Sequence, residues 1–232
     1  MKFPKQDLAI AKKMGRALKE YEMLEDGDVV AVGLSGGKDS YSLLDLLWRR
    51  KKYLPINYQI KALHVDFGYC GEQTQNIIKF CKERDIECYV QKEKLVIKKG
   101  RDVNCFYCSW VRRSILFKFL GKWNIKKLAF GHHMNDAAET LFLNMFYQSK
   151  FESFYPKTRF FKGEFDVIRP LILCTNKEIK EYADRNNLPY HAHSCPFDIE
   201  SQRKKIRDII DKFCIKDEQI LYNIFASWMK SI

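Results

Sequence analysis

The chain has 232 residues, of which 46% are hydrophobic, so it can bury a full core without a disulfide framework. Its 41 lysines and arginines against 29 aspartates and glutamates give a formal net charge of +12, which favours a polyanionic partner such as nucleic acid over a generally basic protein without one. The amphipathic start is not a signal peptide, and no stretch reaches the roughly 18 apolar residues of a membrane helix. We therefore expect a cytoplasmic protein without membrane contact, whose eight cysteines serve metal or redox chemistry.

Helix and strand patterns alternate along the chain after a predicted N-terminal helix at 5–24. The predicted strands are 29–34, 60–66, 86–91, 126–131 and 165–170, and the predicted helices that follow them are 41–50, 73–84, 106–123, 135–148 and 176–187. Two more helices are expected at 200–213 and 216–230. This alternation predicts an α/β fold with a parallel five-stranded sheet and helices on both faces. The expected units are an N-terminal helix (1–25), a central domain that carries the sheet (26–190) and a C-terminal segment with a helical tail (191–232).

Three segments with chemically active side chains each follow a predicted strand, at 35–40, 66–71 and 131–136. Parallel sheets bind their ligands outside the carboxyl ends of the strands. The three segments are therefore expected to meet at one edge of the sheet and to form one site.

The first of these segments reads SGGKDS and lies between a valine-rich strand and a leucine-rich helix. Glycines let a backbone turn tightly around an anion, and the helix N-terminus adds its dipole, so the segment predicts a phosphate site. It is not a Walker A loop, because Asp39 separates Lys38 from Ser40. A carboxylate beside phosphates is unfavourable unless it holds a metal ion, so we interpret Asp39 as a magnesium ligand.

A pair of cysteines, Cys105 and Cys108, opens the third predicted helix of the sheet region. Such a CxxC pair is compatible with zinc, with an iron–sulfur centre or with a redox dithiol, although its place after the third strand argues against a thioredoxin-like unit. Cys195, 87 residues after Cys108, is the best further ligand, and the neighbouring His191 and His193 keep a Cys₃His zinc site open. Cys70 lies in a loop and is a candidate reactive thiol.

The SGGKDS turn resembles that of the PP-loop ATP pyrophosphatases, which cleave ATP between its α and β phosphates and adenylate an oxygen. Together with the CFYCSWVRRSIL, AFGHHMNDAAETLFLNMFY and VIRPL segments, it is similar to the tRNA 2-thiocytidine synthetase (TtcA) family of that group, over roughly residues 15–210. The resemblance implies ATP bound with Mg²⁺ and a [4Fe–4S] cluster held by Cys105, Cys108 and Cys195, with one iron left open to sulfur. It also implies the ATP-binding set Ser35, Gly36, Gly37, Lys38, Asp39, Ser40, Asp66, Gly131 and His132.

Three residues are the expected catalytic groups: Lys38, Arg112 and Asp136. Arg112 follows Cys108 by four residues, on the same face of the predicted helix, and is expected to steady negative charge beside the cluster. Asp136 matches the acid of the family and is expected to handle a metal ion or a proton. The family often has a second acid just before it, where this chain has Asn135, so a two-carboxylate version of the site is in doubt.

Basic clusters recur along the chain, and aromatic residues between them can stack unpaired bases. The RKKIR cluster at 203–207 follows Cys195 closely and is the best candidate to rim the site. The predicted RNA contacts are Arg113, Arg203, Lys204, Lys205 and Arg207.

The sequence thus predicts an ATP-dependent tRNA sulfurtransferase that converts an anticodon-loop cytidine to 2-thiocytidine. Its expected partners are tRNA and a sulfur donor, either a cysteine desulfurase or free sulfide, and a homodimer is possible. The alternatives are thiolation of a tRNA uridine, lysidine-type ligation at a cytidine, which does not need the cysteines, or a zinc-stabilised nucleotide- or RNA-binding module without catalysis.

Overall fold

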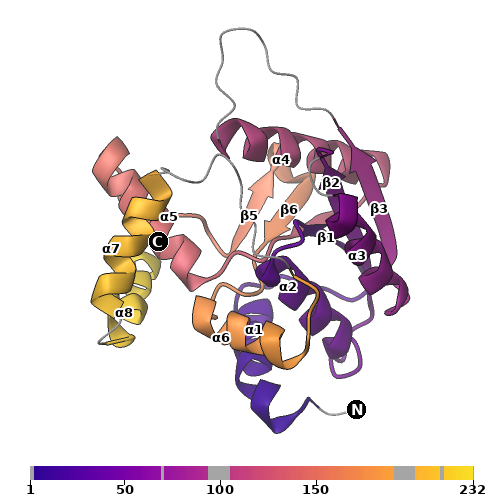
Figure 1. The fold of residues 1–232 in the computed structure, drawn as a ribbon, viewed down its shortest axis with the longest axis horizontal. Helices are drawn as coiled ribbons and strands as arrows, with labels where there is room; N and C mark the ends of the chain where they lie inside the picture. The colour runs from indigo at the N-terminus through magenta and orange to yellow at the C-terminus, as the bar shows by residue number, and fades with distance from the viewer. Residues whose placement is uncertain (1–2, 69–70, 94–104, 191–201, 215–216, 232) are drawn as a thin grey trace, which may run out of the picture.

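The computed structural model describes residues 3–68, 71–93, 105–190, 202–214 and 217–231 (Figure 1). The strands are β1 (Asp28–Leu34), β2 (Tyr58–Asp66), β3 (Glu87–Lys92), β4 (Lys127–Ala129), β5 (Lys157–Phe160) and β6 (Phe165–Ile168). The α-helices are α1 (Leu8–Glu20), α2 (Lys38–Arg50), α3 (Gly71–Lys82), α4 (Cys105–Lys122), α5 (Met134–Gln148), α6 (Asn176–Arg185), α7 (Gln202–Cys214) and α8 (Gln219–Met229). Two short 3₁₀ turns, η1 (Lys5–Asp7) and η2 (Phe161–Gly163), precede α1 and separate β5 from β6.

The strands form a sheet in the order β3-β2-β1-β4-β6-β5. The pairs β1–β2, β2–β3, β1–β4 and β4–β6 are parallel, so the predicted α/β fold is confirmed. The predicted strand number is wrong, because the described sheet has six strands instead of five. The added strand, β5, forms a hairpin with β6 and is antiparallel to it, with Thr158 opposite Val167.

The residues of β1 alternate between the two faces of the sheet, as a strand with a side-chain period of two requires. Val30 and Val32 face the larger core, with α1, α2 and α6, whereas Ala31 faces Leu116 of α4 on the other side. The crossover helix α4 therefore lies on the opposite face from α1, α2 and α6 (Figure 1). The strand order reverses between β1 and β4, and in folds of this kind ligands bind at the carboxyl ends of the strands beside such a reversal.

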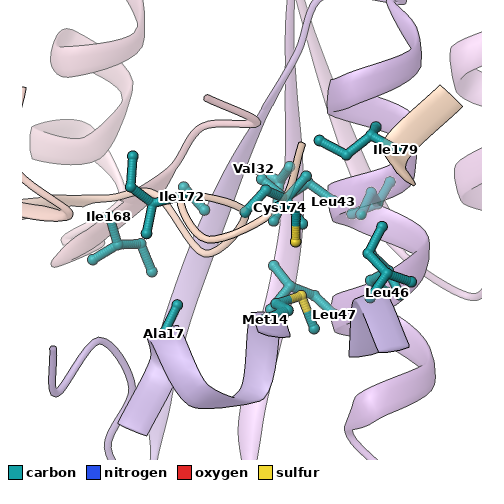
Figure 2. Close-up of a cluster of buried hydrophobic side chains, with 14 of the residues drawn as sticks. Met14, Ala17, Val32, Leu43, Leu46, Leu47, Ile168, Ile172, Cys174 and Ile179 are labelled. Carbon is teal, nitrogen blue, oxygen red and sulfur yellow. The ribbon is translucent and has the colours of Figure 1, made fainter. Parts of the chain in front are cut away.

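The larger core joins segments that are far apart in the sequence. Figure 2 shows Met14 of α1, Leu47 of α2, Cys174 and Ile179 packed around Val32 of the central strand. All five are buried, and each apolar side chain of this size removed from water contributes about 1.5–3 kcal/mol to folding before the entropy cost is counted. The core fixes the position of β1 and α2, and hence of the loop between them.

The C-terminal helices α7 and α8 pack on α5 beside the sheet (Figure 1). Ile206, Ile210, Phe225 and Trp228 enter the same core cluster as the strands, so the tail is an integral part of the folded unit. Within the described ranges, the structure contains no helix with both the length and the apolar character that a membrane crossing needs.

Candidate functional site

The loop Ser35–Gly37 links the end of β1 to the first residue of α2 and has the form of an anion cradle. Gly36 has a φ of +82°, which favours glycine, and the Ser40 hydroxyl donates to the Gly37 carbonyl at 2.9 Å. The Ser35 backbone N–H donates to Ser40 Oγ at 3.3 Å, which closes the turn. Gly37 is the N-cap of α2 and has no side chain with which to cap it. The first N–H groups of α2 are thus available to a phosphate.

Two neighbouring segments pack so closely on this loop that only glycine fits. A Cβ at Gly36 would stand 1.9 Å from Gln73 Nε2, and that amide donates to the Ser35 carbonyl at 3.2 Å. A Cβ at Gly131 would stand 2.7 Å from the backbone oxygen of Asp39 and 3.1 Å from the backbone nitrogen of Ser40. The predicted ATP-binding residues Ser35, Gly36, Gly37, Lys38, Asp39, Ser40 and Gly131 are therefore brought together around one turn.

A histidine that the sequence did not single out for ATP, His133, lies between the two predicted acids. Its Nε2 atom is 3.6 Å from Asp39 Oδ1 and 3.5 Å from Asp136 Oδ2, and its backbone N–H donates to Asp136 Oδ2 at 3.0 Å. Lys38 Nζ pairs with Asp39 Oδ1 at 2.6 Å. The end of β1 and the end of β4 thus contribute Lys38, Asp39, His133 and Asp136 to one cluster of polar side chains. Asn135, the departure from the family pattern, accepts from the backbone N–H of Asn176 at 2.8 Å and ties α5 to α6.

The charge state of Asp136 follows from its neighbours. Burial opposes its ionisation, but His133, His132 and Arg203 outweigh this effect and lower the pKa of Asp136 to about 2. At neutral pH the group is a carboxylate, able to accept hydrogen bonds or to hold a cation. A proton-donating role at neutral pH is disfavoured by that pKa.

His132 packs between the rings of Phe130 and Phe154, with centroids 5.4 and 5.1 Å away. Burial, helped by Arg169 and Arg203, lowers the pKa of His132 to about 4 despite the charge of Asp136. Among the described residues, the buried Nδ1 atoms of His132 and His133 have no hydrogen-bond partner. Two such orphaned atoms, together with the open helix end and the glycine cradle, are what a phosphate-bearing ligand would be expected to satisfy.

We expect His132 to make the protein acid-sensitive. Because its folded-state pKa lies below the unfolded value of 6.5, the unfolded chain takes up the proton first, and the stabilisation present above pH 6.5 is lost as the pH falls towards 4. The loss is about 3 kcal/mol in the free energy of unfolding. His132→Phe keeps a ring between Phe130 and Phe154 and removes the titration. Urea unfolding across this range should give a flatter curve for the variant, and parallel curves would contradict the assignment.

The end of β2 contributes Asp66, the predicted adenosine contact. Asp66 is buried and its Oδ1 accepts from the backbone N–H of Gly68 at 2.8 Å, so one oxygen already closes a turn. His64 Nδ1 lies 2.8 Å from the Leu34 carbonyl, which only accepts, so that nitrogen carries the proton and Nε2 accepts from the Thr74 hydroxyl at 3.2 Å. These bonds fix the end of β2 against β1 and α3. Asp66 therefore stays at the same edge as the phosphate loop.

The helix α4 brings the CxxC segment to the same edge, because a crossover helix runs back against the parallel strands and begins at their carboxyl ends. Cys105 and Cys108 occupy the first turn of α4, but their side chains, like the whole of Cys70 and Cys195, lie outside the described residues. The predicted gathering of three thiolates is thus untested. The Arg112 guanidinium lies 5.5 Å from the centre of the Phe67 ring, next to Asp66, so Arg112 does reach this edge.

The predicted magnesium ligand Asp39 has only part of a metal site around it. Among the described residues, no group of three or more histidine, cysteine, aspartate or glutamate side chains is arranged to hold a metal ion. Magnesium usually takes one or two carboxylates and completes its shell with phosphate oxygens and water. Asp39 beside the phosphate cradle fits that donor set.

Two of the predicted RNA contacts have protein partners. Arg203 and Arg207 of α7 both bind the buried carboxylate of Glu139 on α5, at 2.9 and 2.8 Å, and Arg203 also lies 3.9 Å from Asp136. These ion pairs hold the C-terminal helix α7 against α5. This structural role was not predicted from the sequence. Lys204 and Lys205 are exposed on the same helix and remain candidate RNA contacts.

Comparison with known proteins agrees with a nucleotide-binding site of the PP-loop type. A family model described as a PP-loop domain matches residues 7–213. A tRNA-cytidine(32) 2-sulfurtransferase of Geotalea uraniireducens is 34% identical over 208 residues, which cover 87% of this chain and 82% of the relative. One of Hahella chejuensis is 35% identical over 224 residues, 94% of this chain and 79% of the relative.

Among solved structures, the U34-tRNA thiolase NcsA from Methanococcus maripaludis with its [4Fe-4S] cluster superposes with a TM-score of 0.80. It is 26% identical, and the match covers 97% of this chain and 79% of that protein. The family model covers most of this chain, and both relatives are more than 30% identical to it over more than two thirds of their own length. This chain therefore belongs to the PP-loop family, in the group of its tRNA-cytidine(32) 2-sulfurtransferase relatives.

Proposed function

We propose that this protein is an ATP-dependent tRNA sulfurtransferase that converts cytidine 32 of the anticodon loop to 2-thiocytidine. The observation that carries the proposal is the phosphate cradle between β1 and α2, against which Gly131 packs, at the edge of the sheet where α4 begins with CxxC. ATP would lie with its phosphates at the N-terminus of α2 and its adenosine towards Asp66. The relatives named for this reaction support the choice of cytidine.

To replace the C2 oxygen by sulfur, the reaction needs a good leaving group on C2 and a source of sulfur. The C2 oxygen of the base attacks the α phosphorus of ATP, pyrophosphate leaves, and the oxygen is then bonded to AMP. Sulfur bonds to C2, the C2–O bond breaks and AMP departs with the oxygen. Adenylation converts a poor leaving group into a good one, so the side chains mainly need to orient the reactants and to stabilise charge.

The roles of the chain's own groups follow from their positions. Lys38 would neutralise phosphate charge, and Asp39 would hold Mg²⁺, which bridges phosphate oxygens and offsets their charge. Asp136, ionised at neutral pH, orients His133 and is suited to holding the metal ion rather than to giving up a proton. Arg112 would stabilise negative charge where sulfur is delivered. Gly131 and His132 would border the nucleotide.

Three thiolates, Cys105, Cys108 and Cys195, would hold the [4Fe–4S] cluster. Such a donor set leaves one iron of four without a protein ligand, and when bound the cluster supplies an open coordination position for sulfur. The sulfur donor would be a cysteine desulfurase or free sulfide. A cytoplasmic location fits thiolates that bind a metal, because the reducing cytosol keeps them from forming disulfides. We further propose the division into 1–25, 26–190 and 191–232, and a possible homodimer.

The cysteines provide the direct test. We expect Cys195→Ala to abolish thiolation of tRNA by anaerobically reconstituted protein supplied with ATP and sulfide, while ATP binding stays within about twofold, because the phosphate cradle is built from other segments. The wild-type protein should be brown and absorb near roughly 400 nm. Cys174→Ala, a change at a buried thiol of the core, is the control for general cysteine loss. Full activity in Cys195→Ala, or a colourless zinc protein, would contradict the proposal.

A second candidate is thiolation of a uridine, since NcsA, a U34-tRNA thiolase, shares the fold and is 26% identical to this chain over the matched residues. Nucleoside mass spectrometry of tRNA from a deletion strain distinguishes the two. Loss of 2-thiocytidine supports the first candidate, and loss of a 2-thiouridine derivative supports the second.

A further inference from the structure

Arg169, directly after β6, is a buried cation at the same edge of the sheet as the phosphate cradle. The residue is only 8% exposed to solvent. One terminal nitrogen, Nη1, donates to the Tyr155 carbonyl at 2.5 Å and to the Thr158 hydroxyl at 3.1 Å. The guanidinium carbon lies 4.8 Å from the centre of the Phe154 ring, and the buried Nε has no hydrogen-bond partner among the described residues.

Arg169 carries a buried positive charge. In the part of the chain that the structure describes, no aspartate or glutamate forms an ion pair with it. Burial and the like charge of Arg113 lower the pKa of Arg169 to about 10, which leaves it charged at neutral pH. Burying a cation without an anion is strongly unfavourable, and among the described residues only Nη1 of the guanidinium donates hydrogen bonds, to Tyr155 and Thr158. The arrangement fits a site that an anionic ligand completes.

The position of Arg169 indicates which anion this is. In the strand order β2-β1-β4-β6, the phosphate cradle follows β1, Asp66 ends β2, and Arg169 follows β6 on the far side of β4. The proposed ATP therefore occupies the β2–β1 side, where the α2 N-terminus and Lys38 already serve its phosphates. Arg169 lies on the other side, where the second substrate has to enter, and its guanidinium and the His132 ring both lie near the Phe154 ring. Arg113 is exposed on the α4 turn that follows CxxC.

We propose that Arg169 binds a backbone phosphate of the substrate RNA and so holds the target nucleotide over the site, with the exposed Arg113 on α4 adding positive charge at the same edge of the sheet. The inference rests on the proposed function for the identity of the RNA. A guanidinium fork matches two phosphate oxygens at once, and such charge-assisted pairs are about twice as strong as neutral hydrogen bonds. The Phe154 ring beneath Arg169 keeps the fork in one orientation.

The test compares tRNA binding and ATP binding in four variants. Arg169→Gln and Arg113→Gln should each weaken tRNA binding about 10- to 100-fold, as the loss of a charge-assisted hydrogen bond predicts, and reduce the slope of log affinity against log salt by about one. Arg169→Lys should keep the slope, because it keeps the charge, and recover part of the affinity. Arg159→Gln on β5 is the matched control, since Arg159 is 77% exposed and its Nε is 3.8 Å from Asp166. We expect that variant to bind like the wild type.

Unchanged tRNA affinity and salt slope in both glutamine variants would overturn the inference. So would a loss of ATP affinity without a loss of tRNA affinity, because the phosphate would then be that of ATP. If Arg169→Gln does not fold, the result for the exposed Arg113→Gln variant decides the question. A change in the slope of log affinity against log salt indicates a phosphate contact, whereas a purely structural role leaves that slope unchanged. Binding is measured without turnover, so a protein that binds tRNA through these arginines but never thiolates it would refute the proposed function and leave this inference standing.

Discussion

Gly131→Ala is expected to weaken ATP binding about tenfold and to lower the free energy of unfolding by about 1–3 kcal/mol, the usual cost of overpacking. The added Cβ would stand 2.7 Å from the backbone oxygen and 2.8 Å from the carbonyl carbon of Asp39. Both are backbone atoms at the start of α2, so a rotamer change cannot relieve the contact. The end of β4 and the phosphate cradle would have to move apart, and the cradle's N–H groups would lose their alignment on the phosphates.

The control for this variant is Gly121→Ala, in the last turn of α4. A Cβ at Gly121 meets nothing within 4 Å, so the change should be neutral or stabilising by up to about 1 kcal/mol through helix propensity. Calorimetric ATP titration and urea unfolding measure both variants. An ATP dissociation constant within about twofold of the wild type in Gly131→Ala would show that the cradle does not depend on this close approach.

Much of the fold follows from local pattern. The valine-rich run before SGGKDS and the leucine-rich helix after it are predicted within a few residues of β1 and α2, because both are buried and each has the period of its element. The strand β5 escapes prediction, because KTRF has no run of apolar residues. It is a strand only through its pairing with β6, which depends on the hairpin turn at η2, where Phe161 and Lys162 adopt positive φ values.

The site is predictable to the extent that its residues come from strand ends. The sequence places His132 and His133 side by side, but only the extended backbone at His133, the N-cap of α5, turns that side chain towards both carboxylates. Arg203 and Arg207 look like solvated charges until the buried Glu139 is seen. The sequence did contain a signal for this partner, because Glu139 is an acid within the otherwise apolar stretch of α5. The side chains of the CxxC segment and Cys195 lie outside the described residues, and the cluster remains a proposal.

The largest effect on stability is expected at Asp45, in α2 beneath the phosphate cradle. Its carboxylate is fully buried and accepts hydrogen bonds from Arg84 Nε at 3.0 Å and from the Tyr182 hydroxyl. It also forms ion pairs with Arg84 Nη2 at 2.9 Å and Arg49 Nε at 2.8 Å. Asp45→Ala should lower the free energy of unfolding by about 3–5 kcal/mol, because it leaves Arg49 and Arg84 packed against the core without a buried counter-charge. The exposed Glu83, 3.8 Å from Arg84 Nη1, is too weak a partner to replace Asp45.

The reason lies in what surrounds Arg84. Its guanidinium lies 3.5 Å from the centre of the Phe80 ring and 5.4 Å from that of Trp48, and the side chain is only 15% exposed, so it cannot move fully into water without uncovering both rings. The control is Glu181→Ala, whose surface pair with Arg185 at 3.7 Å is worth no more than about 0.5 kcal/mol. Urea unfolding measures both. A loss at Asp45 as small as at Glu181 would mean that Arg84 relaxes to solvent on its own, and that the helix carrying the phosphate cradle is anchored by its leucines alone.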